Sequence, residues 1–156
     1  MINSFEHFTM DIFSITRSWN RLANEEMKKY GLRGAYALYL VVIESSKGQI
    51  TAAKLADLCQ RDKADVSRAV SAFQKKGILE PYGESKYRAS LTLTKQGKEL
   101  AAQISRRASI VIEQAGQDLS EEMRENMYQC LDSIALRMRE ICEAEGLETE
   151  LSVSLS

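Results

Sequence analysis

The segment between residues 51 and 94 constrains the fold more than any other part of this 156-residue chain. Thr51 is placed to cap a short helix over residues 52–58, because its side chain can accept a backbone N–H of the first turn. A three-residue turn follows, and Asp62 is placed to cap a second helix over residues 63–76, which ends at a glycine. The segment therefore predicts two capped helices joined by a tight turn.

A two-stranded hairpin is predicted directly after the second helix. Its strands are residues 78–82 and 88–93, its tip is residues 83–85, and residues 49–51 are expected to add a short third strand. Pro81 has no backbone N–H, so its strand should lie at an edge. Helix, turn, helix and hairpin in this order predict a winged helix-turn-helix.

The second helix has two chemically different faces. The face expected to be buried is apolar and consists of Val66, Ala69, Val70 and Phe73. The opposite face mixes small side chains, which allow close approach to the major groove, with polar ones that bind base edges and phosphates. The predicted DNA contacts of this helix are Lys63, Ala64, Asp65, Ser67, Arg68, Ser71 and Lys75. An ordinary amphipathic surface helix would explain the same pattern in isolation, but the elements on either side favour the DNA role.

Asp65 is the ambiguous member of this set. An acid near phosphates is costly unless it accepts from a cytosine amine or pairs with Arg68. Lys86 and Arg88 lie at or near the hairpin tip, where a basic wing can follow the DNA backbone or enter the minor groove. A solvated hairpin whose charges only aid solubility is the alternative. Because the wing follows a groove-compatible helix, both residues are predicted to contact DNA.

Long amphipathic helices are predicted on both sides of this segment. The first, residues 4–29, and the last, residues 121–145, carry apolar side chains at alternating three- and four-residue steps, and residues 95–116 form another amphipathic helix. Residues 32–45 are apolar nearly all round and should be central. The apolar surface of these long helices is larger than a small winged helix can cover. It therefore needs a partner: another long helix, a second subunit or both. The predicted dimer contacts are Phe5, Phe8, Ile12, Cys130, Ile134 and Ile141.

The predicted fold is mainly α with a small β-hairpin wing, in which a winged helix-turn-helix core lies between long N- and C-terminal dimerisation helices. We expect a single domain over residues 1–156, with residues 1–45 and 95–145 mainly in dimerisation, residues 49–94 in DNA binding and residues 147–156 as a flexible tail. A two-fold dimer would place two recognition helices about 34 Å apart on one face of a duplex.

Charge is distributed unevenly along the chain, whose net charge is -1. Residues 61–88 contain seven Lys and Arg against four acids, whereas residues 1–60 contain seven against six and residues 89–156 seven against twelve. The basic excess therefore coincides with the predicted second helix and hairpin, which favours a DNA-facing surface there.

Other function classes are disfavoured by the residue types present. His7 is the only histidine and has no cysteine or acid cluster with triad or metal spacing, so neither an enzyme nor a metal or other cofactor is predicted. The glycines do not form a phosphate loop, and the longest apolar run, residues 35–43, is too short to span a membrane. Three cysteines without redox spacing, and no signal peptide, fit a reducing cytoplasm.

Four fragments follow one another in a specific order and spacing. They are Leu55-Ala56, then Asp62-Lys63-Ala64-Asp65-Val66-Ser67-Arg68-Ala69-Val70, then Lys75-Lys76-Gly77-Ile78-Leu79, and finally Leu91-Thr92-Leu93-Thr94-Lys95-Gln96-Gly97. With them, the chain resembles the MarR family of bacterial transcriptional regulators (multiple antibiotic resistance regulators) over almost its whole length. The last fragment is similar to that family's LT-x-x-G signature.

The resemblance implies an obligate homodimer on a pseudo-palindromic double-stranded DNA operator, and usually repression that a small aromatic effector relieves. By position, Ser67 and Arg68 match the family's helix residues that touch DNA, and Thr51 matches the start of the helix that contacts phosphates. The wing departs from the family pattern. Ser85-Lys86-Tyr87 stands where Asp-x-Arg is common, so that Lys86 or Arg88 would substitute for the tip arginine.

An effector pocket is predicted where the first two helices and the fifth meet. Its candidate lining residues are Phe13, Trp19, Tyr36 and Tyr39. Packing in the core or in a dimer interface is the alternative for each of them, because aromatic residues at helical spacing are usually core.

Two other functions stay open. A dimeric winged helix that has lost DNA binding would be a protein–protein adaptor or anti-regulator, although an adaptor would tend to show apolar anchors on the second helix. A thiol-based redox regulator would need a reactive cysteine. Cys59 lies near Arg61 and Lys63, but the first helix, where the family's peroxide sensors carry their reactive cysteine, has none.

Overall fold

The computed structural model describes residues 3–82 and 89–145. Within these ranges the chain is mainly helical, as predicted, and the segments after the fourth helix pair through isolated β-bridges and not through continuous strands. The helices are α1 (Ser4–Lys28), α2 (Tyr36–Ser45), α3 (Ala52–Cys59), α4 (Lys63–Lys75), α5 (Lys95–Ala115) and α6 (Glu121–Ala144). The chain divides into two compact units, residues 1–107 and residues 108–156. In the described part of the chain, none of the helices has the length and apolar character needed to cross a membrane.

Polar side chains at the helix starts explain where four of the helices begin. Asn3 caps α1 in a reciprocal arrangement, accepting from the backbone N–H of Glu6 at 2.8 Å while the Glu6 carboxylate accepts from the N–H of Asn3 at 3.2 Å. The predicted caps Thr51 and Asp62, and likewise Ser120 before α6, each accept from the N–H three residues later. These boundaries follow from local sequence alone.

The second helix begins four residues later than the prediction of residues 32–45. Gly31 takes a left-handed conformation with φ 63°, and the N–H of Gly34 donates to the Asn24 side chain of α1 at 3.0 Å. A β-carbon at Gly34 would collide with Asn24. The turn therefore presses against α1, and helical geometry starts only at Tyr36.

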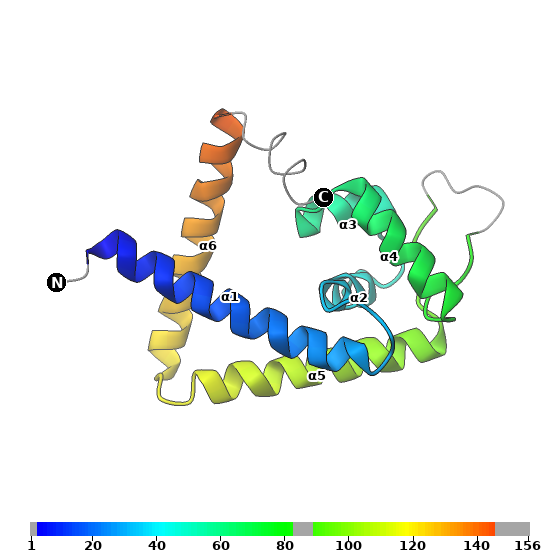
Figure 1. The fold of residues 1–156 in the computed structure, drawn as a ribbon, viewed down its shortest axis with the longest axis horizontal. Helices are drawn as coiled ribbons and strands as arrows, with labels where there is room; N and C mark the ends of the chain where they lie inside the picture. Colours follow the sequence, from blue (N-terminus) through cyan, green and yellow to red (C-terminus); the bar gives the residue numbers. More distant parts are fainter. Residues whose placement is uncertain (1–2, 83–88, 146–156) are drawn as a thin grey trace. The chain divides into compact units, whose positions relative to one another are not determined.

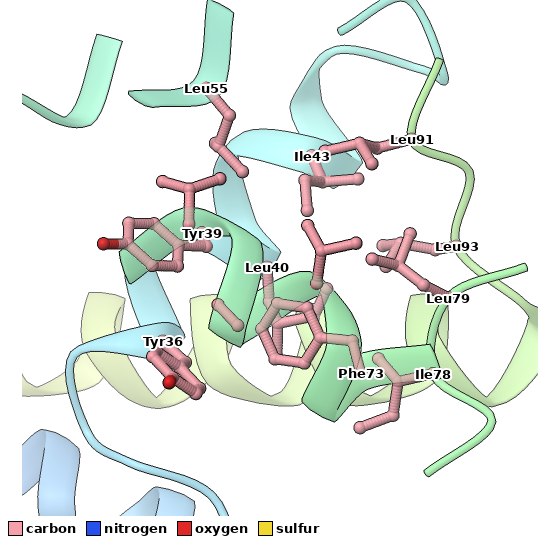
Figure 2. Packing of buried hydrophobic residues seen from close by; sticks show 14 of the residues in the cluster. Tyr36, Tyr39, Leu40, Ile43, Leu55, Phe73, Ile78, Leu79, Leu91 and Leu93 are labelled. Atoms are coloured by element: carbon pink, nitrogen blue, oxygen red, sulfur yellow. The ribbon is translucent and has the colours of Figure 1, made fainter. Parts of the chain in front are cut away.

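The core of residues 1–107 forms between α2, α3, α4, the first half of α5 and the wing, and Met27 of α1 joins it (Figure 1). Figure 2 shows Tyr39, Leu40 and Ile43 of α2 meeting Leu55 of α3 and Phe73 of α4. The wing side chains that close this cluster are Ile78, Leu79, Leu91 and Leu93. The expectation that α2 is central is confirmed, although Leu38 on its other side remains 52% exposed.

The predicted strands of the wing are reduced to isolated pairings in the described residues. Thr51 bridges Ser90 and Leu79 bridges Leu93, both antiparallel. The N–H of Leu91 donates to the carbonyl of Ile50 at 2.7 Å, so the segment before α3 pairs with the wing as expected. The predicted tip at residues 83–85, and the tail at residues 147–156, lie outside the described residues.

The unit formed by residues 108–156 is built on the connection between α5 and α6. The guanidinium of Arg124 donates to the carbonyl of Gly116 at 2.7 Å and to that of Leu119 at 3.4 Å, which fixes the turn between the helices. In the described residues of α6, every side chain is exposed or half-buried.

Candidate nucleic-acid interface

Helix α4 is held by its apolar face and presents the opposite face to solvent. Its buried residues are Val66, Ala69, Val70 and Phe73, which is the face predicted to be buried. Its exposed residues include Lys63, Ala64, Ser67, Arg68, Ser71 and Lys75, which are six of the seven predicted DNA contacts on this helix. Small and polar side chains thus form one accessible surface, compatible with entry into a major groove.

The turn before α4 gives this helix a defined direction. Gln60 takes a left-handed conformation with φ 51°, and the N–H of Arg61 donates back to the carbonyl of Ala56 at 3.0 Å. Asp62 then caps α4 through the N–H of Asp65 at 2.6 Å. The chain therefore reverses between α3 and α4 through backbone contacts that do not depend on a ligand.

Asp65, the seventh predicted contact, faces the protein instead of solvent. Its side chain is only 13% exposed, and its Oδ2 accepts a 2.6 Å hydrogen bond from the hydroxyl of Tyr39. Its Oδ1 lies 3.2 Å from Nη1 of Arg33 and 3.5 Å from Nη2 of Arg68. Both carboxylate oxygens are engaged inside the protein, so the pairing with Arg68 that the sequence left open is present.

The electrostatics of this cluster keep Asp65 charged and Tyr39 neutral. Burial would raise the pKa of the Asp65 carboxyl, but the Tyr39 hydrogen bond and the charges of Arg33 and Arg68 outweigh burial and hold this pKa below its ordinary value. Burial and the Asp65 carboxylate raise the pKa of Tyr39 well above its ordinary value. The tyrosine hydroxyl therefore keeps its proton and donates it.

Thr51 and Thr94 connect α3 and α4 to the wing and to α5. Thr51 is half-buried, caps α3 through the N–H of Lys54 at 3.2 Å, and bridges the wing at Ser90. Thr94 caps α5 through the N–H of Gly97 at 3.0 Å, and its hydroxyl lies 2.6 Å from the carbonyl of Gly77, to which it donates. The end of α4, the wing and the start of α5 are thereby tied together.

Sequence reasoning missed two features of this interface. Arg33, in the turn before α2, reaches the first turns of α4, yet no motif or periodicity distinguished it. Gly97 packs so closely on the wing that a β-carbon there would collide with the carbonyl of Ile78. The LT-x-x-G signature marked Gly97 as a family residue, but the sequence did not show that its role is close packing against Ile78.

The other predicted site residues are not gathered in one place. Lys86 and Arg88 lie outside the described residues. Tyr36 and Tyr39 belong to the core cluster, whereas Phe13 and Trp19 are 70% and 42% exposed on α1. Phe13 borders an open hollow of about 580 Å³ along α1, which other α1 residues complete. The predicted pocket therefore stays a prediction.

The predicted dimer contacts lie on exposed apolar surfaces. Phe5, Phe8 and Ile12 are exposed on α1. Cys130, Ile134 and Ile141 are exposed on α6, which carries further exposed methionine, leucine and tyrosine side chains. Each helix alone presents more apolar area than an isolated surface helix normally does.

Cys59, the cysteine that lies near basic residues in the sequence, is not an activated thiol. Burial raises the pKa of the half-buried Cys59 thiol, and the nearby Arg61 only partly opposes this effect. A raised pKa lowers the thiolate fraction, and the thiolate is the reactive form. Arg61 therefore lowers the pKa of the Cys59 thiol by less than burial raises it.

Comparisons with protein-family models and with curated protein sequences gave no match. Solved structures do match over most of the chain. The transcriptional regulator SlyA is 25% identical, with a TM-score of 0.77 over 87% of this chain and 96% of its own. A MarR family regulator from Listeria monocytogenes, complexed with 26mer DNA, is 24% identical, with a TM-score of 0.76 over 92% and 94%.

A third structure, the S. aureus MepR–DNA complex, is 17% identical, with a TM-score of 0.71 over 88% of this chain and 97% of its own. The matching structures are those of transcriptional regulators and not of enzymes. The resemblance found in the sequence is thus confirmed, and the chain has the fold of the MarR and SlyA family of DNA-binding transcriptional regulators.

Proposed function

We propose that this protein is a sequence-specific, double-stranded DNA-binding transcriptional regulator that inserts α4 into the major groove. The observation that carries the proposal is the solvent-facing surface of α4, where Ser67, Arg68, Ser71 and Lys75 stand among small side chains on a rigid, apolar base. Two proteins with the same fold were solved with DNA, which supports this use of the fold. The exposed face of α4 offers no large apolar anchor for a protein partner.

We further propose that the protein acts as a homodimer on a pseudo-palindromic operator. The exposed apolar faces of α1 and α6 support this, because such faces on separate helices need a partner surface of the same kind. A two-fold dimer presents two α4 helices to half-sites about one helical turn apart. Repression relieved by a small aromatic ligand is the regulation that the family resemblance favours.

Fluorescence anisotropy tests DNA binding directly. The labelled duplex carries the sequence upstream of the protein's own gene, a scrambled duplex of equal length is the control, and both are titrated at two salt concentrations. Specific binding predicts that only the first duplex stays bound at the higher salt. Equal, salt-sensitive loss of both duplexes would contradict specific recognition of that operator.

The variant Arg68→Ala assigns the binding to α4. We expect at least a tenfold weaker complex with the upstream duplex, because an arginine in the groove contributes about 1–3 kcal/mol. Arg137→Ala on α6 is the matched control, since it also removes an exposed arginine paired with a carboxylate. Equal affinities for Arg68→Ala and the wild type would show that α4 is not the reading helix.

A further inference from the structure

Arg33 lies outside the helix-turn-helix segment but beside the recognition helix. Its Nη1 is 3.2 Å from Oδ1 of Asp65, and Nη2 of Arg68 is 3.5 Å from the same oxygen. The two guanidinium groups therefore converge on one carboxylate oxygen. Because Arg68 belongs to the exposed face of α4, Arg33 borders that face.

Arg33 is both oriented and accessible. Its guanidinium carbon lies 5.4 Å from the centroid of the Tyr36 ring, which is itself buried and stacked against Tyr39. The Arg33 side chain is nevertheless 64% exposed. A guanidinium held by a ring and a carboxylate has already lost much rotamer freedom, so binding a phosphate costs it little further entropy.

The charges around Asp65 do not cancel. One carboxylate faces two guanidinium groups, and Tyr39 donates to its other oxygen without adding charge. The two guanidinium groups on Asp65 therefore leave one positive charge at this cluster, while the carboxylate of the N-cap residue Asp62 offsets the helix dipole at the start of α4.

A purely structural role explains this arrangement less well. Tyr39 already anchors Asp65 from the core through a 2.6 Å hydrogen bond. An exposed ion pair adds only about 0–1 kcal/mol to folding. Neither the exposure of Arg33 nor its convergence with Arg68 is needed to hold the turn before α2.

We propose that Arg33 contacts the DNA backbone as a phosphate-binding residue, and that Asp65 positions Arg33 and Arg68 for this interface. The inference rests on the proposed function and extends the DNA-binding surface beyond residues 49–94. The contact adds affinity and not sequence discrimination, because phosphates carry no base information.

The test measures the salt dependence of binding for the wild type, Arg33→Ala and Arg137→Ala, with the upstream and scrambled duplexes. Arg33→Ala should weaken both complexes by a similar factor of about tenfold. The slope of log K against log salt should become shallower by about 0.9 per protomer, or roughly 1.8 for a dimer. Arg137→Ala removes the same charge elsewhere and should leave the slope unchanged.

Folding effects are separated by a second variant and by urea unfolding. Arg33→Gln retains a donor for Asp65 but removes the charge, so it should reproduce the change in slope with less effect on stability. A wild-type slope in both variants would overturn the phosphate contact and leave DNA binding by α4 intact. Loss of discrimination between the two duplexes would also overturn it, since Arg33 would then act on bases or on the placement of α4.

Failure of the proposed function has a different signature. If the wild type binds neither duplex at the lower salt, DNA binding itself fails and the Arg33 contact fails with it. If the wild type binds both duplexes equally, sequence specificity is contradicted. The difference in salt slope between the wild type and Arg33→Ala then still shows whether Arg33 contacts a phosphate.

Discussion

At the level of single residues, Tyr39 links the core to α4. The residue is fully buried among apolar side chains, and its hydroxyl meets the Asp65 carboxylate near the start of α4. A hydrogen bond to an ionised acceptor is stronger than one between neutral groups. Tyr39 thereby fixes Asp65, and through it the two arginines that border the exposed face of α4.

Removal of the Tyr39 hydroxyl should destabilise the fold. Tyr39→Phe keeps the ring but leaves Asp65 without its shortest hydrogen bond, so the free energy of unfolding should fall by about 1–3 kcal/mol. Tyr128→Phe, at an exposed position on α6, should change it by less than about 0.5 kcal/mol. Urea unfolding at neutral pH measures both values, and equal stabilities would mean that the hydroxyl contributes nothing.

The depressed pKa of Asp65 predicts a pH dependence of stability. Because this pKa is lower in the folded state than the ordinary value of about 3.9, the ionised carboxylate contributes stability that is fully present above about pH 4. That contribution is lost as the pH falls through the folded pKa. Asp65→Asn should therefore be less stable at neutral pH but lose less stability on acidification than the wild type.

Urea unfolding of both proteins between about pH 6 and pH 2 tests this prediction, since all other carboxylates are common to the two. The two stability curves should converge at low pH. Parallel curves would show that Asp65 titrates alike in the folded and unfolded states.

At the level of elements, the junction between the wing and α5 depends on close backbone approach. Gly97, in the first turn of α5, lies against the carbonyl of Ile78, and Thr94 bonds the carbonyl of Gly77 at the end of α4. Three elements meet at this point without space for a side chain. This packing explains physically why a threonine and a glycine stand three residues apart here.

Substitution of Gly97 should reveal this constraint. Gly97→Ala forces α5 away from Ile78 and should lower the free energy of unfolding by about 1–3 kcal/mol. Gly116→Ala is the matched control, because its β-carbon would meet neighbours at 3.4 Å or more. Urea unfolding compares the two, and a Gly97→Ala protein as stable as the control would show that the junction can relax.

At the level of the whole molecule, the exposed apolar surface is the dominant feature. Helix α6 extends over 24 residues without a buried one, and α1 buries only Met27 within the chain. Helical stability in proteins comes mainly from packing of an apolar face. The chain is therefore expected to complete its packing in a homodimer.

A charge on the apolar face of α6 that contains Cys130, Ile134 and Ile141 should disrupt the proposed dimer. Ile134→Asp places a carboxylate in the proposed interface, where burial without a partner costs several kcal/mol. Ser133→Asp adds the same charge one position away on the same exposed helix. Sedimentation equilibrium should give a dimer for the wild type and Ser133→Asp, and monomer or unfolded chain for Ile134→Asp. A stable Ile134→Asp dimer would exclude this face from the interface.

The sequence by itself determined the features that depend on local chemistry. Caps at Thr51 and Asp62 were predicted because each involves an N–H only three residues away. The two faces of α4 follow from helical periodicity, which places residues three and four apart on one side. The antiparallel pairing of the wing with itself and with Thr51 follows from alternation between turn residues, although it is limited to isolated bridges in the described residues.

Only the tertiary structure decided the features that depend on distant partners. The sequence left the role of Asp65 open, because Tyr39 and Arg33, which engage it, lie 26 and 32 positions away. The late start of α2 follows from contact of Gly34 with Asn24, and the need for Gly97 follows from Ile78. Periodicity and capping carry no information on such pairs, because close packing between elements is set by how the whole core closes.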